Sequence, residues 1–347
     1  MFEKFDVEGE AIIIDALRGL AALLVLVSHA DAYYLIRIAP IVPYSGYLGA
    51  IGVCIFFILS GYLIWRSAGR TLAQANGLRT YALHRAARIM PLYYVALAFA
   101  FVVFPHISDH RADVTTYTVI RHVTFTQALL PDVSTAVNPV LWTLTYEMLF
   151  YLVVPFLYAL RRYFSFLLIV SIFTFVLGHI FPSPYFKFFN LLPLFVLGMW
   201  LAEYRIALTW RFALVSMGAA IILGLIGSRA YLISALWAVA VLSAAISLRG
   251  YRASLIFKVF AWVGVCSYSL YIWHYMMIES IGPGLMRFDH FPERYPLITA
   301  VCFTTLAIGA AWASYKLIER PAQIWIRKSF SRPSGGNRQE AAEQPQN

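Results

Sequence analysis

Residues 12–34 read IIIDALRGLAALLVLVSHADAYY, an apolar run long enough to cross a bilayer as a helix. The run carries Asp15 and Arg18 near one end and His29 near the other. Arg18 and His29 are eleven positions apart, so they project from one helix face about 16 Å apart. Ionisable groups in a membrane span usually face a bundle interior or an aqueous cavity. Each residue alone could equally be structural, but the aligned set favours a functional site.

The composition is that of an integral membrane protein. Of the 347 residues, 61% are hydrophobic and 13% are charged, whereas about a quarter of a soluble domain is charged. No small-residue cleavage site follows the first apolar run, so we expect a retained helix and not a signal peptide. Cys54, Cys266 and Cys302 lie in apolar runs without metal-type spacing, so we expect packing residues and no metal site.

The apolar runs predict an all-α integral membrane fold with about ten transmembrane helices. Their approximate limits are 12–34, 47–65, 91–105, 141–160, 164–181, 189–203, 212–227, 231–248, 259–279 and 297–315. Residues 1–330 form one transmembrane domain in this prediction. The polar segment 331–347 lacks large apolar residues, so we expect a disordered cytoplasmic tail.

The loop charges predict the orientation. With a cytoplasmic N-terminus, nineteen Lys and Arg residues fall in inner segments and seven in outer segments. The positive-inside rule therefore places both termini in the cytoplasm. The same asymmetry explains the net charge of +10 without a nucleic acid partner. The longest outer segment, 106–140, is expected to be a solvated loop.

This orientation places three polar side chains at one depth. At 1.5 Å per residue, Glu147 and His274 lie roughly 7–9 Å below the outer ends of their spans, near the level of His29. A carboxylate and two imidazoles at one level suit acid–base chemistry near the outer face. The competing interpretation is a polar network that joins helices. We favour chemistry for His29 and Glu147, and the network for His274.

A second set of polar residues is predicted at the cytoplasmic level. Arginines close to a glycine, where the backbone can approach a ligand, suit a phosphate-bearing molecule. For Arg85 and Arg88, which precede the third span, the alternative explanation is the ordinary excess of positive residues on the cytoplasmic side. The candidate donor-binding residues are Arg18, Ser60, Gly61, Tyr62, Arg85 and Arg88.

The ordered set of motifs resembles the membrane acyltransferase-3 family over residues 8–325. The matching elements are Arg18 and His29 in an arginine–ten residues–histidine motif, Phe56-Phe57 with Ser60-Gly61-Tyr62, Arg85 and Arg88 followed by Pro91, Trp142-Thr-Leu-Thr-Tyr-Glu147, Ser267, Tyr271 and His274 in SYSLYIWHY, and Glu319-Arg320-Pro321. Each element alone has low specificity, whereas the six in this order are specific.

The resemblance implies a ten-helix enzyme of the bacterial inner membrane. It implies transfer of an acyl group, usually acetyl, from cytoplasmic acyl-CoA to a hydroxyl of a surface, exported or lipid-linked glycan. Some relatives of this kind act on small molecules. Others carry an extra extracytoplasmic domain, which we do not expect here, so a second transfer step would need a separate extracytoplasmic transferase.

The family and the predicted depths suggest one mechanism with open alternatives. The CoA phosphates would bind near the cytoplasmic arginines, and the thioester would reach His29. His29 would act as the general base or as an acyl relay through an acyl-histidine. Glu147 would orient His29 or be the base itself. Trp142 and His274 are the expected substrate contacts.

A transporter or flippase of a glycan intermediate is the alternative from another functional class. Buried charges would then form a substrate or proton pathway. The sequence has no internal repeat, which argues mildly against a transporter. Binding of CoA would distinguish the two classes.

Overall fold

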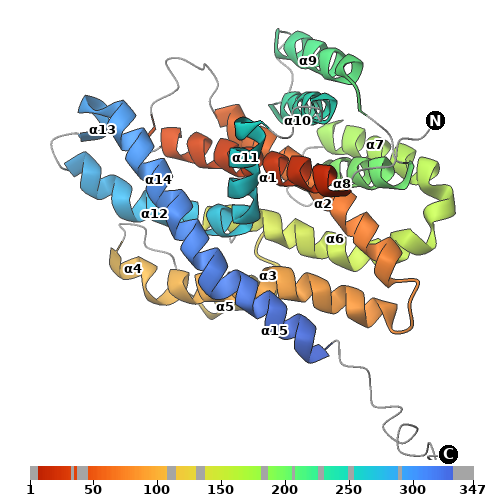
Figure 1. The fold of residues 1–347 in the computed structure, drawn as a ribbon, viewed down its shortest axis with the longest axis horizontal. Coiled ribbons are helices and arrows are strands. Elements are labelled where there is room, and N and C mark those ends of the chain that lie inside the picture. The colour runs from red at the N-terminus through yellow and green to blue at the C-terminus, as the bar shows by residue number, and fades with distance from the viewer. Residues whose placement is uncertain are drawn as a thin grey trace, which may run out of the picture.

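The computed structural model describes residues 7–32, 35–36, 46–107, 115–129, 137–180, 187–204, 208–225, 230–248, 254–287 and 291–330. Within these ranges every regular element is a helix, as the sequence predicts (Figure 1). The expected tail, 331–347, lies outside the described residues.

The chain folds into long helices joined by short ones. The long helices are α1 (Val7–Ala32), α2 (Gly46–Thr71), α3 (Gly77–Val102), α6 (Trp142–Ala159), α7 (Phe164–Ile180), α8 (Lys187–Tyr204), α9 (Trp210–Leu225), α10 (Ala230–Ser247), α11 (Leu255–Val265), α12 (Ser267–Arg287), α14 (Pro296–Ser314) and α15 (Arg320–Phe330). The short elements are α4 (Phe104–Ile107), η1 (Pro139–Leu141), α5 (Thr116–Val123), η2 (Arg161–Tyr163), α13 (Phe291–Arg294) and the π-helix η5 (Tyr315–Glu319).

Several helices are suited to a membrane. Among the described residues, five helices are long and apolar enough to cross it, and a sixth span results if the bent pair of α11 and α12 counts as one. The same part of the chain contains three shorter apolar helices: Phe188–Tyr204, Trp210–Leu225 and Tyr231–Ser247. These findings support a multi-pass membrane protein. The count of ten spans and the cytoplasmic termini stay predictions.

Helix α1 lies centrally and is crossed by α11 (Figure 1). Small residues allow this close approach, as is common between membrane helices. A Cβ added at Gly264 of α11 would lie 1.8 Å from the carbonyl oxygen of Asp15. One added at Gly19 would lie 2.0 Å from the carbonyl oxygen of Phe260. The crossing therefore requires glycine on both helices, beside the Asp15 and Arg18 pair.

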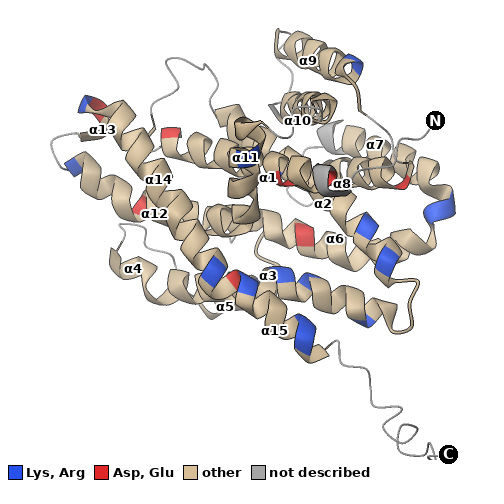
Figure 2. Ribbon diagram, in the orientation of Figure 1, with Lys and Arg blue, Asp and Glu red and all other residues tan. Residues whose placement is uncertain are grey.

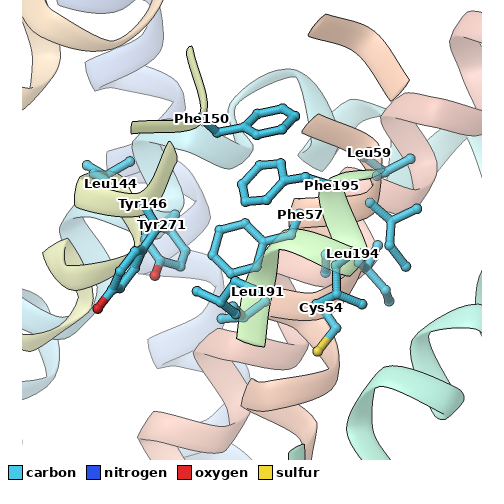
Figure 3. Packing of buried hydrophobic residues seen from close by; sticks show 14 of the residues in the cluster. Cys54, Phe57, Leu59, Leu144, Tyr146, Phe150, Leu191, Leu194, Phe195 and Tyr271 are labelled. Carbon is cyan, nitrogen blue, oxygen red and sulfur yellow. The ribbon is translucent and has the colours of Figure 1, made fainter. Parts of the chain in front are cut away.

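An aromatic core joins α2, α6 and α8. Phe195 of α8 lies between Phe57 of α2 and Phe150 of α6, with ring centroids 4.7 Å and 3.9 Å apart (Figure 3). Glycine again permits close contact, because a Cβ added at Gly198 would lie 1.9 Å from the carbonyl oxygen of Ile58. This packing sets the rotation of α2 about its axis. It therefore also decides which residues of α2 face away from α8.

The structure refines two expected boundaries. The sequence predicts one span over 259–279, and the structure breaks this stretch at Cys266, with a bend of 72° between α11 and α12. The third span, expected over 91–105 with either end open to extension, corresponds to α3, which begins at Gly77, so residues 72–76 separate α2 from α3. Apolar content marks where a span lies, but polar arginines can continue a helix beyond it. Arg85 and Arg88 therefore lie on a helix, not in a loop.

The expectation of a solvated loop at 106–140 is also wrong for its described part. This part includes α5 and is packed onto α3, because the Tyr93 hydroxyl donates to the carbonyl oxygen of His122 at 2.7 Å. The side chains of His122 and Gln127 are fully buried. Gln127 donates to the carbonyl oxygen of Leu141 at 2.9 Å, which connects this segment to the start of α6.

Charged residues are few along the described helices (Figure 2). A group of them lies where α3 runs beside η5 and α15. These contacts bring the C-terminal end of the domain against the arginines of α3. Arg88 of α3 also lines the cavity of the candidate site.

Candidate active site

A cavity of about 70 Å³ lies between α1, α2, α3, α6 and α12. Four of the residues proposed from the sequence line it, together with hydroxyl-bearing side chains of α6 and α12. Its polar wall consists of Arg18, Ser60, Arg88, Thr143, Glu147, Ser267, Tyr268 and Tyr271. The structure thus brings together arginines and a carboxylate that lie far apart in the sequence.

Glu147 is held in this wall by two hydroxyl groups. It accepts a hydrogen bond from Ser60 of α2 at 3.2 Å and another from Tyr151, one turn along α6, at 2.6 Å. Arg88 lies within electrostatic range of the same carboxylate. Glu147 is therefore oriented toward the arginines by neutral donors.

The two arginines share a set of carboxylates. Arg18 Nη1 pairs with Asp15 Oδ1 at 3.2 Å, one turn back on α1. Glu319 lies within electrostatic range of both Arg18 and Arg88. Two arginines surrounded by carboxylates form a partly compensated charge cluster, which is expected for ionised groups inside an apolar bundle.

Sequence reasoning did not assign Glu319 to the site. Its side chain is only 5% exposed, and it ends the π-helix η5. Ser269 donates to Glu319 at 2.8 Å, and Gln323 donates to it at 3.2 Å. Short π-helical turns often occur at functional sites, where they re-aim a side chain. The Glu-Arg-Pro ending was visible in the sequence, but its position beside Arg18 was not.

His29 pairs directly with His274. Their nearest ring nitrogens, Nδ1 of His29 and Nε2 of His274, are 3.0 Å apart. The other nitrogen of His274, Nδ1, lies 2.8 Å from the carbonyl oxygen of Tyr271. Because a carbonyl oxygen can only accept, the hydrogen-bond network assigns the proton of His274 to Nδ1.

This assignment determines the state of His29. Nε2 of neutral His274 is left as an acceptor, so Nδ1 of His29 must donate to it. Nε2 of His29 then carries a free lone pair. The relay from His29 through His274 to a backbone carbonyl therefore fixes which nitrogen can accept a proton, because the hydrogen bond made by one ring nitrogen of a histidine sets the role of the other.

Tyr271 contributes to the cavity wall and also contacts His274. Its ring lines the cavity, and its centroid is 5.8 Å from that of His274. Its hydroxyl donates to the carbonyl oxygen of Val140 at 2.9 Å and lies 2.8 Å from the hydroxyl of Thr143. His29 itself is not among the lining residues. Tyr271 thus connects the cavity wall to the ring of His274.

Glu147 and His29, which the sequence predicts to act together, have different hydrogen-bond partners in the structure. Glu147 hydrogen-bonds Ser60 and Tyr151, whereas His29 hydrogen-bonds His274. Depth within a span was estimated from residue number, which leaves the rotation of each helix undetermined. The rotation of α6 directs Glu147 toward the arginines.

Residues 12–316 match the acyltransferase-3 family model, which is described as an acyltransferase domain. The chain belongs to this acyltransferase family. It is 31% identical over 195 residues to the predicted acetyltransferase ORF330 of Acidianus two-tailed virus, covering 55% of this chain and 54% of the viral protein. It is 31% identical over 151 residues to an O-acetyl transferase of Shigella phage Sf6, covering 40% and 43% of the two chains. The chain spans about half the length of these relatives, and no solved structure matches it.

The remaining residues proposed for donor binding do not line the cavity. Arg85 Nη2 donates to the hydroxyl of Ser67 at 2.8 Å. A Cβ added at Gly61 would lie 2.1 Å from the carbonyl oxygen of Phe195, so this glycine serves the packing of α2 on α8. Tyr62 hydrogen-bonds Glu10.

The two expected substrate contacts differ in position. His274 is buried in its pair with His29. Trp142 is partly buried, and its ring centroid lies 5.9 Å from that of Tyr146. Among the described residues, no group of three His, Cys, Asp or Glu side chains is arranged to hold a metal ion.

Proposed function

We propose that this acyltransferase moves an acyl group, in the first instance acetyl, from a cytoplasmic acyl-CoA to a hydroxyl group of a glycan. The glycan would be lipid-linked or extracytoplasmic, and the membrane would be the bacterial cytoplasmic membrane. The family match supports acyl transfer, and the phage relative named as an O-acetyl transferase supports an oxygen acceptor.

The observation that carries the proposal is the cavity between the charge cluster and the histidine pair. Arg18 and Arg88 line it, and Tyr271 connects its wall to His274. Arginine binds phosphate through charge-assisted hydrogen bonds. The phosphates of the donor would bind at these arginines, with its thioester arm following α1 over the roughly 16 Å to His29.

The proposed reaction uses the free lone pair on Nε2 of His29. This nitrogen takes the proton of the acceptor hydroxyl as the hydroxyl oxygen bonds to the thioester carbonyl carbon. The carbon–sulfur bond then breaks. The leaving thiolate takes this proton from His29, which releases free CoA and restores the neutral imidazole. His274 would be a positioning residue for His29. Glu147 would balance the charge of Arg88, since its hydrogen bonds go to Ser60 and Tyr151.

The test is acyl transfer by the purified full-length protein in nanodiscs, measured beside CoA binding. His29→Gln keeps a hydrogen-bonding amide but cannot take the proton, so transfer should fall by about 10²–10⁴-fold while CoA affinity is retained. Near-native transfer by this variant would remove His29 from the role of base. Failure of the wild-type protein to bind CoA would reject the donor and favour a transporter or flippase.

A further inference from the structure

The break between α11 and α12 leaves unpaired backbone donors beside the cavity. The first hydrogen bond of α12 runs from the Leu270 nitrogen to the carbonyl oxygen of Cys266 at 2.9 Å. The N–H groups of Ser267, Tyr268 and Ser269 therefore have no acceptor within their own helix. Ser267 and Tyr268 both line the cavity. A helix start with free N–H groups attracts anions.

The side chain of Ser267 is an independent sign of a missing ligand. It is only 1% exposed, and its hydroxyl oxygen has no hydrogen-bond partner among the described residues. It nevertheless lines the cavity. A buried hydroxyl without a partner is destabilising, so such groups usually have a function or a bound partner.

Arg88 of α3 adds a positive charge to the cavity wall. Its guanidinium forms no hydrogen bond or ion pair with the side chains in the described part of the chain, although Glu147 and Glu319 lie within electrostatic range. Those two carboxylates already accept hydrogen bonds from neutral donors. The donor groups of Arg88 therefore remain available to a ligand inside the cavity.

We propose that the start of α12, the hydroxyl of Ser267 and the guanidinium of Arg88 form a subsite for one phosphate group. The volume of about 70 Å³ is room for a few water molecules, which suits a phosphate group. The phosphate would come from the diphosphate of the acyl-CoA donor or from that of a lipid-linked saccharide. The choice between these ligands rests on the proposed function, but phosphate binding itself can be measured without any transfer.

The test compares two serines of α12 in the full-length protein in nanodiscs. Ser267→Ala removes the unpaired hydroxyl, whereas the control Ser280→Ala removes one that donates to the carbonyl oxygen of Met276. Loss of a hydrogen bond to a charged group should weaken pyrophosphate binding about 10- to 100-fold in Ser267→Ala and leave the control unchanged. Arg88→Lys keeps the charge but loses the fork of donors, so it should also weaken binding.

The ligand source follows from parallel titrations with CoA and with a short isoprenyl diphosphate. Weakening of CoA binding alone by Ser267→Ala assigns the subsite to the donor, and weakening of isoprenyl diphosphate binding alone assigns it to the acceptor lipid. Equal pyrophosphate affinity in Ser267→Ala, the control and the wild type would overturn the subsite. Intact pyrophosphate binding that depends on Ser267, without any acyl transfer, would keep the subsite and reject the proposed function.

Discussion

His274→Ala tests whether the histidine relay positions the base. The substitution removes the acceptor that lies 3.0 Å from Nδ1 of His29. Without it, the proton of His29 is free to move to Nε2, the nitrogen that the proposed mechanism needs as a lone pair. His274 is buried, so we expect little direct access of water to replace it.

The size of the effect follows from the hydrogen bond between the two histidines. Leaving a buried donor without its partner costs about 1–3 kcal/mol, which is roughly 5- to 150-fold. We therefore expect kcat to fall about 10-fold. The affinity for CoA should not change, since Arg18 lies about three helical turns away.

The assay combines steady-state kinetics in nanodiscs with nitrogen NMR of isotope-labelled histidines, which distinguishes the two tautomers. His274→Gln is the matched control, because its side-chain oxygen can accept a hydrogen bond near the position of the lost Nε2. We expect the Gln variant to retain most of kcat and the Nδ1–H form of His29. Wild-type kcat in His274→Ala, or an Nε2–H tautomer in the wild-type protein, would refute the relay.

Two further predictions concern orientation and packing. In an otherwise cysteine-free chain, Ala73→Cys between α2 and α3 should react with an impermeant maleimide only from the cytoplasm, and Thr124→Cys after α5 only from outside; the reverse labelling would invert the topology. Gly264→Ala should reduce stability by about 1–3 kcal/mol, because its Cβ would lie 1.8 Å from the carbonyl oxygen of Asp15. Gly309→Ala, whose Cβ would meet nothing within 4 Å, is the control, and equal melting temperatures for the two variants would contradict the crossing.

The sequence determined the class of fold and several of the residues that line the candidate site. Long apolar runs can bury their backbone polar groups in lipid only as helices, so hydrophobicity and length were sufficient to predict a helical membrane protein. The pairing of Arg18 with Asp15 was also predictable, because residues three apart meet on any helix. Arg18, Ser60, Arg88 and Glu147, all proposed from the sequence, line one cavity.

Only the tertiary structure decided which distant side chains meet. His29 lies beside His274, 245 positions away, while Glu147 turns toward Arg88. Residue number along a span gives depth, but the rotation of a helix about its axis is set by packing against its neighbours. The break at Cys266 and the buried Glu319 depend on the same contacts. Local sequence therefore determined the helices, and the close crossings between them determined the site.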